Sequence, residues 1–121
     1  MAIPKPKLQL QKGTVVPPDV PNIFTAAENN DVRALELALE YYDVNERDES
    51  DMTPLHYAAS TLSNLTIDRL LAHPDIDATL ADKFGRSAAT VAFECWGLLS
   101  DRIVDKLNPH CYPWLYGSMN S

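Results

Sequence analysis

Three copies of one seven-residue pattern organise this chain. The clearest copy is TPLHYAA at residues 53–59, and weaker copies begin 32 residues earlier at Pro21 and 34 residues later at Ser87. Apolar or small residues occupy the third, sixth and seventh places of all three copies. A period of about 33 residues holds a turn and two helices, and such units stack because one unit alone cannot bury its apolar face. The spacing therefore predicts a stack of about three repeats.

Helix signals support this organisation. Thr53 can act as an N-cap, and Pro54 suits the first position of a helix. Apolar residues recur at helical spacing between Asp31 and Tyr42, and Asn30 or Asp31 can cap that helix. The sequence predicts helices at residues 23–29, 31–42, from 54 onward, 65–73, 88–95 and 100–107, with charged loops at residues 43–52 and 75–86.

The distribution of proline and aromatic residues divides the chain into three parts. Five of the nine prolines lie in the N-terminal arm at residues 1–21, which excludes a helix there. Residues 8–11 alternate apolar and polar side chains, a Lys-Gly turn follows at 12–13, and residues 14–16 are β-branched. This arm is therefore a short hairpin, an extended arm or a disordered tail. We predict that the repeat domain follows at residues 22–108 and an aromatic tail at 109–121. We expect the tail to cap the open end of the stack; left exposed, it would anchor a partner.

The charge of the chain is acidic and uneven. The net charge is −7, although residues 1–20 carry three lysines against Asp19 alone. An acidic domain is repelled by phosphates, so we predict no direct nucleic-acid binding and a protein partner with a basic patch. The alternative is that the acidic surface only keeps the protein soluble. The sequence has no apolar run that could span a membrane and no secretory signal. It therefore predicts a cytoplasmic protein, or one delivered into a host cell, and leaves the oligomeric state open.

Side chains with the spacing of a catalytic or metal site are missing from the sequence. Cys95 and Cys111 form no C-x-x-C pair and the three histidines are scattered, so we predict no metal site and two free thiols. No nucleotide-binding, metalloprotease or serine-hydrolase string occurs. The sequence thus predicts no cofactor and no enzyme activity.

Two motifs resemble those of the ankyrin-repeat family. TPLHYAA at residues 53–59 resembles the TPLHxAA signature of that family almost letter for letter, and residues 82–87 resemble its DxxGxT turn. The resemblance covers about residues 21–107. It implies an all-α solenoid of about three helix-turn-helix repeats with short β-like turns between the repeats. It also implies a structural His56, whose ring hydrogen-bonds to the backbone and ties adjacent turns together.

The sequence departs from the family pattern at three places. Asp51 stands where the family usually has glycine, and aspartate tolerates the left-handed backbone of that position with some strain. Leu62 replaces the usual glycine between two helices, so we expect that turn to be altered. Two extra residues around 96–99 leave the register of the third repeat open. In the middle repeat, we expect Leu55 and Leu71 to be buried between neighbours.

The resemblance implies a protein-recognition module that binds through the groove-side tips of the turns and the first helix of each repeat. We expect the strongly acidic first turn to project into the groove, opposite a basic and aromatic second turn. By position, the protein-binding residues are Glu28, Asn29, Asp48, Glu49, Ser50, Met52, Tyr57, Ser60, Thr61, Lys83, Phe84, Arg86, Glu94 and Cys95. We predict an adaptor or scaffold that holds one partner, although a lone binding module acts most simply by occupying a site. The alternatives are a stoichiometric inhibitor, such as an anti-toxin or a phage- or pathogen-encoded blocker, and a degenerate enzyme or nucleic-acid mimic.

Overall fold

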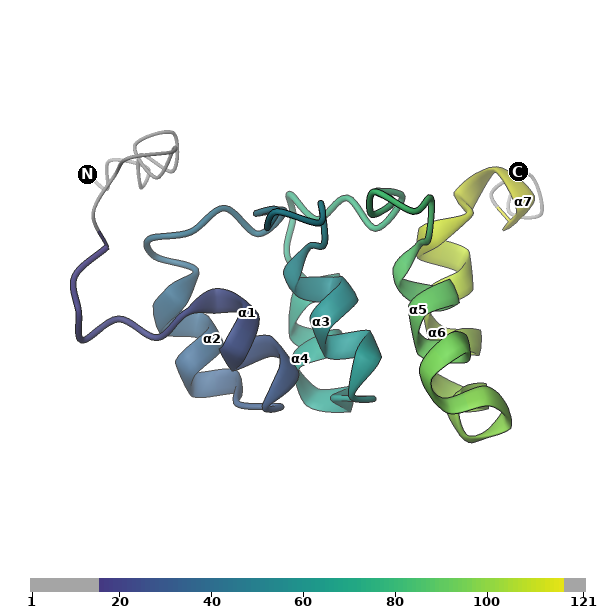
Figure 1. The fold of residues 1–121 in the computed structure, drawn as a ribbon, viewed down its shortest axis with the longest axis horizontal. Helices are drawn as coiled ribbons and strands as arrows, with labels where there is room; N and C mark the ends of the chain where they lie inside the picture. Colours follow the sequence, from purple (N-terminus) through teal and green to yellow (C-terminus); the bar gives the residue numbers. More distant parts are fainter. Residues whose placement is uncertain (1–15, 117–121) are drawn as a thin grey trace.

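Three helix pairs stand side by side in the computed structural model, which describes residues 16–116 (Figure 1). The predicted hairpin at residues 8–16 and the last five residues of the tail lie largely outside that range. The elements are α1 (Ile23–Glu28), α2 (Val32–Ala38), α3 (Pro54–Ser60), α4 (Asn64–Leu71), α5 (Ala88–Trp96), the 3-10 helix η2 (Gly97–Ser100), α6 (Asp101–Cys111) and α7 (Pro113–Tyr116). The described residues contain helices and no strand, which confirms the all-α solenoid.

Side-chain caps start the helices where the sequence predicts. Asn22, Asp31, Thr53 and Ser87 each accept a hydrogen bond from an amide in the first turn that follows. Thr53 also completes a capping box, because the His56 side chain accepts a hydrogen bond from the Thr53 amide. These bonds satisfy amides that have no partner within the helix, so they fix where each inner helix begins.

The core runs through the stack between the inner helices α1, α3 and α5 and the outer helices α2, α4 and α6. Small residues such as Ala27 and Ala59 are fully buried, so neighbouring inner helices pack closely. In the middle repeat Leu55 and Leu70 are buried, whereas Leu71 is only partly buried. The prediction for Leu55 is confirmed and that for Leu71 is wrong, because the phase of α4 points Leu70 into the core.

The turns between paired helices are the same in the first two repeats. Asn30 and Leu62 both have a left-handed backbone, with φ of 59° and 53°. Each donates its amide to the carbonyl three residues earlier, at 3.3 Å for Asn30 and 3.1 Å for Leu62. The expected alteration at Leu62 is therefore wrong: the leucine adopts the left-handed conformation that glycine favours, at a strain of about 1–2 kcal/mol. Asp51 adopts the left-handed conformation expected of it, with φ of 62°.

The third repeat is longer than the other two. Its extra residues form η2, and α6 continues beyond the predicted end at Leu107 and the predicted domain boundary at 108 to reach Cys111. Pro109 lies in the last turn, where its missing amide costs one helical hydrogen bond. Burial of Leu107 and Cys111 on one face of α6 compensates that loss. Both cysteines are free thiols, as predicted, and burial raises the pKa of Cys111.

The segment after α6 turns back over α5. The Tyr112 hydroxyl lies 2.7 Å from the Ser87 hydroxyl, and its ring meets the Trp114 ring edge-on at 5.7 Å. Trp114 and Leu115 on α7 are exposed. Tyr112 is thus the part of the tail that covers the last inner helix. Within residues 16–116, no helix combines the length and apolar character needed to cross a membrane.

Candidate functional site

The turn at residues 43–52, named here the first finger, is built around Asp48. One oxygen of this carboxylate accepts hydrogen bonds from the amides of Ser50, at 2.8 Å, and Met52, at 2.9 Å. The other oxygen accepts the hydroxyl of Tyr57 on α3. Asp48, which we predicted to be a binding residue, is therefore part of the frame that holds the finger on α3.

The Asp48–Tyr57 bond fixes the charge of this pair. Burial acts to raise the pKa of Asp48, but the hydrogen bonds from Tyr57, Met52 and Ser50 outweigh burial and lower that pKa. The same bond, with burial and the negative charge of Asp48, raises the pKa of Tyr57 to about 12. At neutral pH the pair therefore consists of a carboxylate and a neutral phenol.

The turn at residues 75–86, the second finger, repeats this construction around the buried Asp82. Its carboxylate accepts the amides of Phe84 and Arg86, both at 2.9 Å, and the Arg86 guanidinium at 2.8 Å. Arg86 also pairs with Glu94 on α5 at 3.0 Å. Burial acts to raise the pKa of Asp82, but its bonds to Arg86 and Phe84 lower it. Arg86 is thus engaged within the finger and is not a free cation at its tip.

Hydrogen bonds join the two fingers edge to edge. The Lys83 amide donates to the Ser50 carbonyl at 2.9 Å. The Asn45 side chain donates to the Asp75 carbonyl at 2.8 Å and accepts the Asp77 amide at 2.9 Å. These bonds hold the fingers as one row along the edge of the stack (Figure 1), so we treat them as a single rigid rim.

His56 ties α3 to the second finger, as the sequence predicts. Its Nδ1 atom accepts the Thr53 amide at 3.1 Å, and its Nε2 atom lies 2.8 Å from the Arg86 carbonyl. The ring is buried, and burial is the main cause of its lowered pKa. Both ring nitrogens are occupied by structural partners, so neither is placed to exchange a proton with a substrate.

A pocket of about 610 Å³ opens between the first finger and the start of α1. It is lined by Asn22, Phe24 and residues 47–51. The ring of Phe24 lies against the ring of Tyr57, with 5.0 Å between centroids. Glu49 and Asp51 are exposed, and neither has an ion-pair partner among residues 16–115. The pocket therefore combines an aromatic side chain with exposed carboxylates, although Phe24 was not among the residues predicted from sequence.

The tip of the second finger is apolar and flanked by cations. The Phe84 side chain is 70% exposed. The Lys83 ammonium lies 5.5 Å and the Arg86 guanidinium 5.4 Å from the centre of its ring. These cation–π contacts hold the ring in an exposed position.

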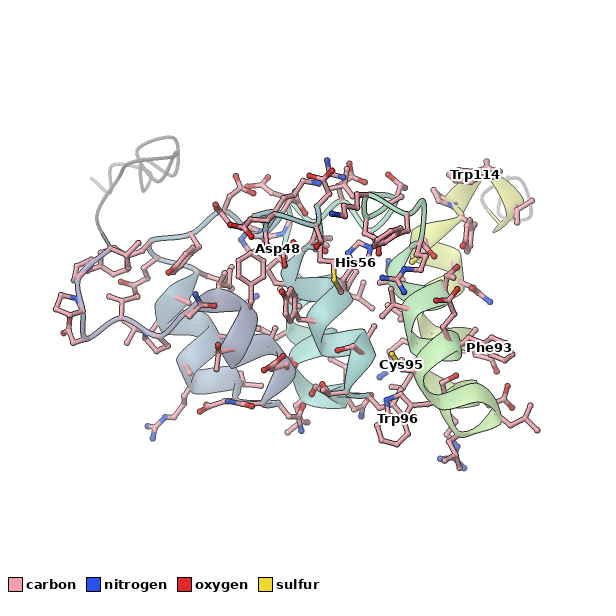
Figure 2. The ribbon with its side chains drawn as sticks, viewed as in Figure 1. Asp48, His56, Phe93, Cys95, Trp96 and Trp114 are labelled. Atoms are coloured by element: carbon pink, nitrogen blue, oxygen red, sulfur yellow. The ribbon has the colours of Figure 1, made fainter. Side chains whose placement is uncertain are left out.

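The remaining predicted residues form a second row, at the far ends of the inner helices. Figure 2 shows Cys95 near that end of α5, away from Asp48 and His56. The Thr61 hydroxyl donates to the Glu28 carbonyl at 2.9 Å, and the Trp96 indole donates to the Ser60 carbonyl at 2.7 Å. Asn29 is exposed on the same row, whereas Glu94 is exposed on α5 and pairs with Arg86 of the second finger. Several members of this row therefore link repeats together. Sequence analysis missed Trp96, whose only signal was its place in the two-residue extension.

The acidic side chains do not converge on a metal. Among the described residues, no group of three or more histidine, cysteine, aspartate or glutamate side chains is arranged to hold an ion. The carboxylates of the first finger either accept amides of their own turn, as Asp43 and Asp48 do, or point to solvent, as Glu49 does.

The repeat arrangement has a counterpart in a known family. Residues 23–107, which include α1 to α5 and most of α6, match the family model for ankyrin repeats in three copies. A comparison with curated proteins gave no match. The matched range is most of the chain, and the caps, fingers and buried histidine lie within it. The chain therefore belongs to the ankyrin-repeat family.

Proposed function

We propose that this chain binds a basic segment of a partner protein in the pocket beneath the first finger, and that it acts as an adaptor or scaffold. Ankyrin repeats are generally protein–protein interaction modules rather than enzymes. The 610 Å³ pocket carries this proposal, because it brings an aromatic ring and exposed carboxylates together.

The chemistry of the pocket favours a lysine or arginine side chain. The aliphatic stem of such a side chain packs on an aromatic face such as that of Phe24, and its charged end is attracted to the ring and to carboxylates. Glu49 and Asp51 supply those carboxylates at the rim. Arg47 lines the same pocket, but its guanidinium donates to the Ala81 carbonyl at 2.9 Å and is thereby held toward the second finger.

The charge of the repeats supports a basic partner over nucleic acid. Residues 16–86 carry five basic and fourteen acidic side chains, a net charge of −9. The negative electrostatic potential around these residues repels phosphates and speeds the approach of a positively charged protein. Phe84 offers an apolar anchor next to Lys83, so we expect an apolar or acidic group of the partner at the second finger.

A comparison of three baits tests this proposal. The wild-type chain, Glu49→Lys and Asp105→Lys are used to capture proteins from the cells that produce the chain, and bound proteins are quantified by mass spectrometry. Each variant changes the net charge by two units, but only Glu49 lines the pocket; Asp105 is an exposed carboxylate on α6. A partner of the pocket is kept by Asp105→Lys and lost from Glu49→Lys.

Equal capture by all three baits would show that the pocket is not the interface. Once a partner is identified, its own activity is measured with a stoichiometric amount of the chain. An adaptor leaves that activity intact, whereas the alternative of an inhibitor requires its loss.

A further inference from the structure

Phe93 occupies a position that alanine holds in the other repeats. Ala27 and Ala59 lie at the equivalent places of α1 and α3, and both are fully buried against the next inner helix. In the third repeat no helix pair follows among the described residues, and the Phe93 side chain is 54% exposed. Figure 2 shows this ring pointing out of the end of the stack, on the side of α5 away from α3.

An apolar surface surrounds Phe93. A pocket of about 210 Å³ is lined by Ala89, Thr90, Phe93, Val104, Asn108 and Tyr112. Trp114 and Leu115 on α7 and Leu98 and Leu99 on η2 are also exposed. Both elements belong to the last repeat of the stack, where η2 and α7 lie at opposite ends of the α5–α6 pair (Figure 1). We name the pocket and these four side chains the C-terminal end surface.

The area of this surface is large for a monomer. Nine large hydrophobic side chains are exposed within the described range, and five of them, at 54% to 86% exposure, belong to the C-terminal end surface. Together they present on the order of 500 Å² of apolar area. The largest apolar patch of a typical monomer covers a few hundred Å², and one side of a stable interface buries about 800 Å². The five side chains lie along the length of the last helix pair and the helix that follows it. The surface therefore supplies most of one side of an interface.

A helix pair of a second chain could not pack on this surface in the way that the repeats of one chain pack on each other. Inner helices pack closely in the first two interfaces because alanine stands at the contact, and a phenylalanine ring takes up that space. At the opposite end of the stack, residues 16–21 run past α1 and α2, where Val16, Pro17 and Val20 are partly buried (Figure 1). Head-to-tail association of two chains is therefore disfavoured from both sides.

We propose that the C-terminal end surface binds the same surface of a second copy of this chain, which gives a closed two-fold dimer. Charge favours this arrangement. Residues 87–116 carry two basic and three acidic side chains, a net charge of −1, whereas residues 16–86 carry −9. Joining the nearly neutral ends keeps the two acidic regions apart, and a two-fold contact closes without adding further copies.

Sedimentation equilibrium of the full chain tests the dimer. We expect a dissociation constant on the order of 1 µM to 100 µM. The mean mass should therefore rise toward twice the 13.5 kDa of one chain as the concentration approaches about 100 µM, with no larger species. A single-chain mass throughout that range, or growth beyond two copies, overturns the proposal.

Matched variants locate the contact. Phe93→Glu buries a charge in the proposed interface and weakens the dimer at least tenfold, and Trp114→Ala, which alters only α7, also weakens it. Leu65→Glu is the control, because Leu65 is 55% exposed on α4, in the middle repeat and outside this surface. Circular dichroism checks that each variant keeps its helices. A dimer that Phe93→Glu and Trp114→Ala leave unchanged, or that Leu65→Glu weakens equally, contradicts the proposed surface.

Discussion

The Nε2 atom of His56 lies 2.8 Å from the carbonyl oxygen of Arg86, so one buried imidazole joins the middle repeat to the second finger. On the other side of the ring, the Thr53 amide donates to Nδ1. A nitrogen that accepts an amide carries no proton, so these partners assign the neutral tautomer with its proton on Nε2. The helix cap, the histidine and the next finger therefore form one connected unit.

This tautomer predicts a pH-dependent stability. Burial is the main cause that lowers the pKa of His56 below 6.5, and the bond to Arg86 and the charge of Asp82 only partly oppose it. The unfolded chain therefore binds a proton that the folded chain resists. The contribution of neutral His56 to the free energy of unfolding is therefore fully present above pH 6.5. It is lost as the pH falls from 6.5 toward the lowered pKa of the folded state. We expect urea denaturation to give a smaller free energy of unfolding at pH 5.5 than at pH 7.5.

A His56→Gln variant is the control for this slope. Glutamine keeps a polar side chain but does not titrate, so the variant is less stable at pH 7.5 and changes less between the two pH values. Parallel pH profiles for the wild type and the variant would show that another group is responsible.

Asp82 should matter more to folding than any carboxylate at the tip of the first finger. Asp82→Ala removes a buried carboxylate that accepts two amides and pairs with the partly exposed Arg86, so we expect a loss of about 2–3 kcal/mol. Glu49→Ala removes an exposed side chain and should stay within about 0.5 kcal/mol of wild type. Thermal and urea unfolding of both variants measure the difference, and equal losses would contradict the proposed frame.

Leu70 and Leu71 are neighbours on α4 with different environments. Leu70 is fully buried and Leu71 only partly. We expect Leu70→Ala to cost about 2–5 kcal/mol, as core truncations do, and Leu71→Ala to cost clearly less. Denaturant midpoints of the two variants decide the question. Reversed values would mean that α4 is rotated relative to the description given above.

The periodic and local features of this chain could be predicted from sequence. The 32- and 34-residue spacings predict the repeats because each repeat buries its apolar face on the next. Thr53 and Ser87 predict helix starts because a cap acts within its own turn. His56 followed from the family resemblance, and its two bonds confirm the structural role.

Features that depend on contacts between distant residues could not be predicted. Asp48 looked like one of several free carboxylates, but Tyr57 and two amides bind it. Leu62 keeps a glycine-like turn because its side chain packs against the core, which offsets its local strain. The pocket beneath the first finger depends on Phe24, which is near that finger in space but more than twenty residues away along the chain. No local pattern reports such an encounter.

The two fingers should act on different steps of binding, the first on association and the second on dissociation. Glu49 lies at the rim of the acidic pocket and is not part of the frame, so Glu49→Lys should slow association and reduce its dependence on salt without unfolding the chain. Asp48 is unsuitable for this test because its reversal would also break the finger. Phe84→Ala should instead speed dissociation, by about tenfold for an anchor worth about 1.4 kcal/mol.

Surface-plasmon kinetics with a captured partner, at low and high salt, separate these two effects. Steering by long-range charge changes the association rate and is screened by salt, whereas loss of an apolar anchor changes the dissociation rate at both salt concentrations. Asp105→Lys has the same change in net charge as Glu49→Lys but lies on α6, so it should keep wild-type kinetics. If Glu49→Lys and Phe84→Ala both bind as wild type does, the fingers are not the interface, and the second row of residues at the ends of the inner helices becomes the surface to test.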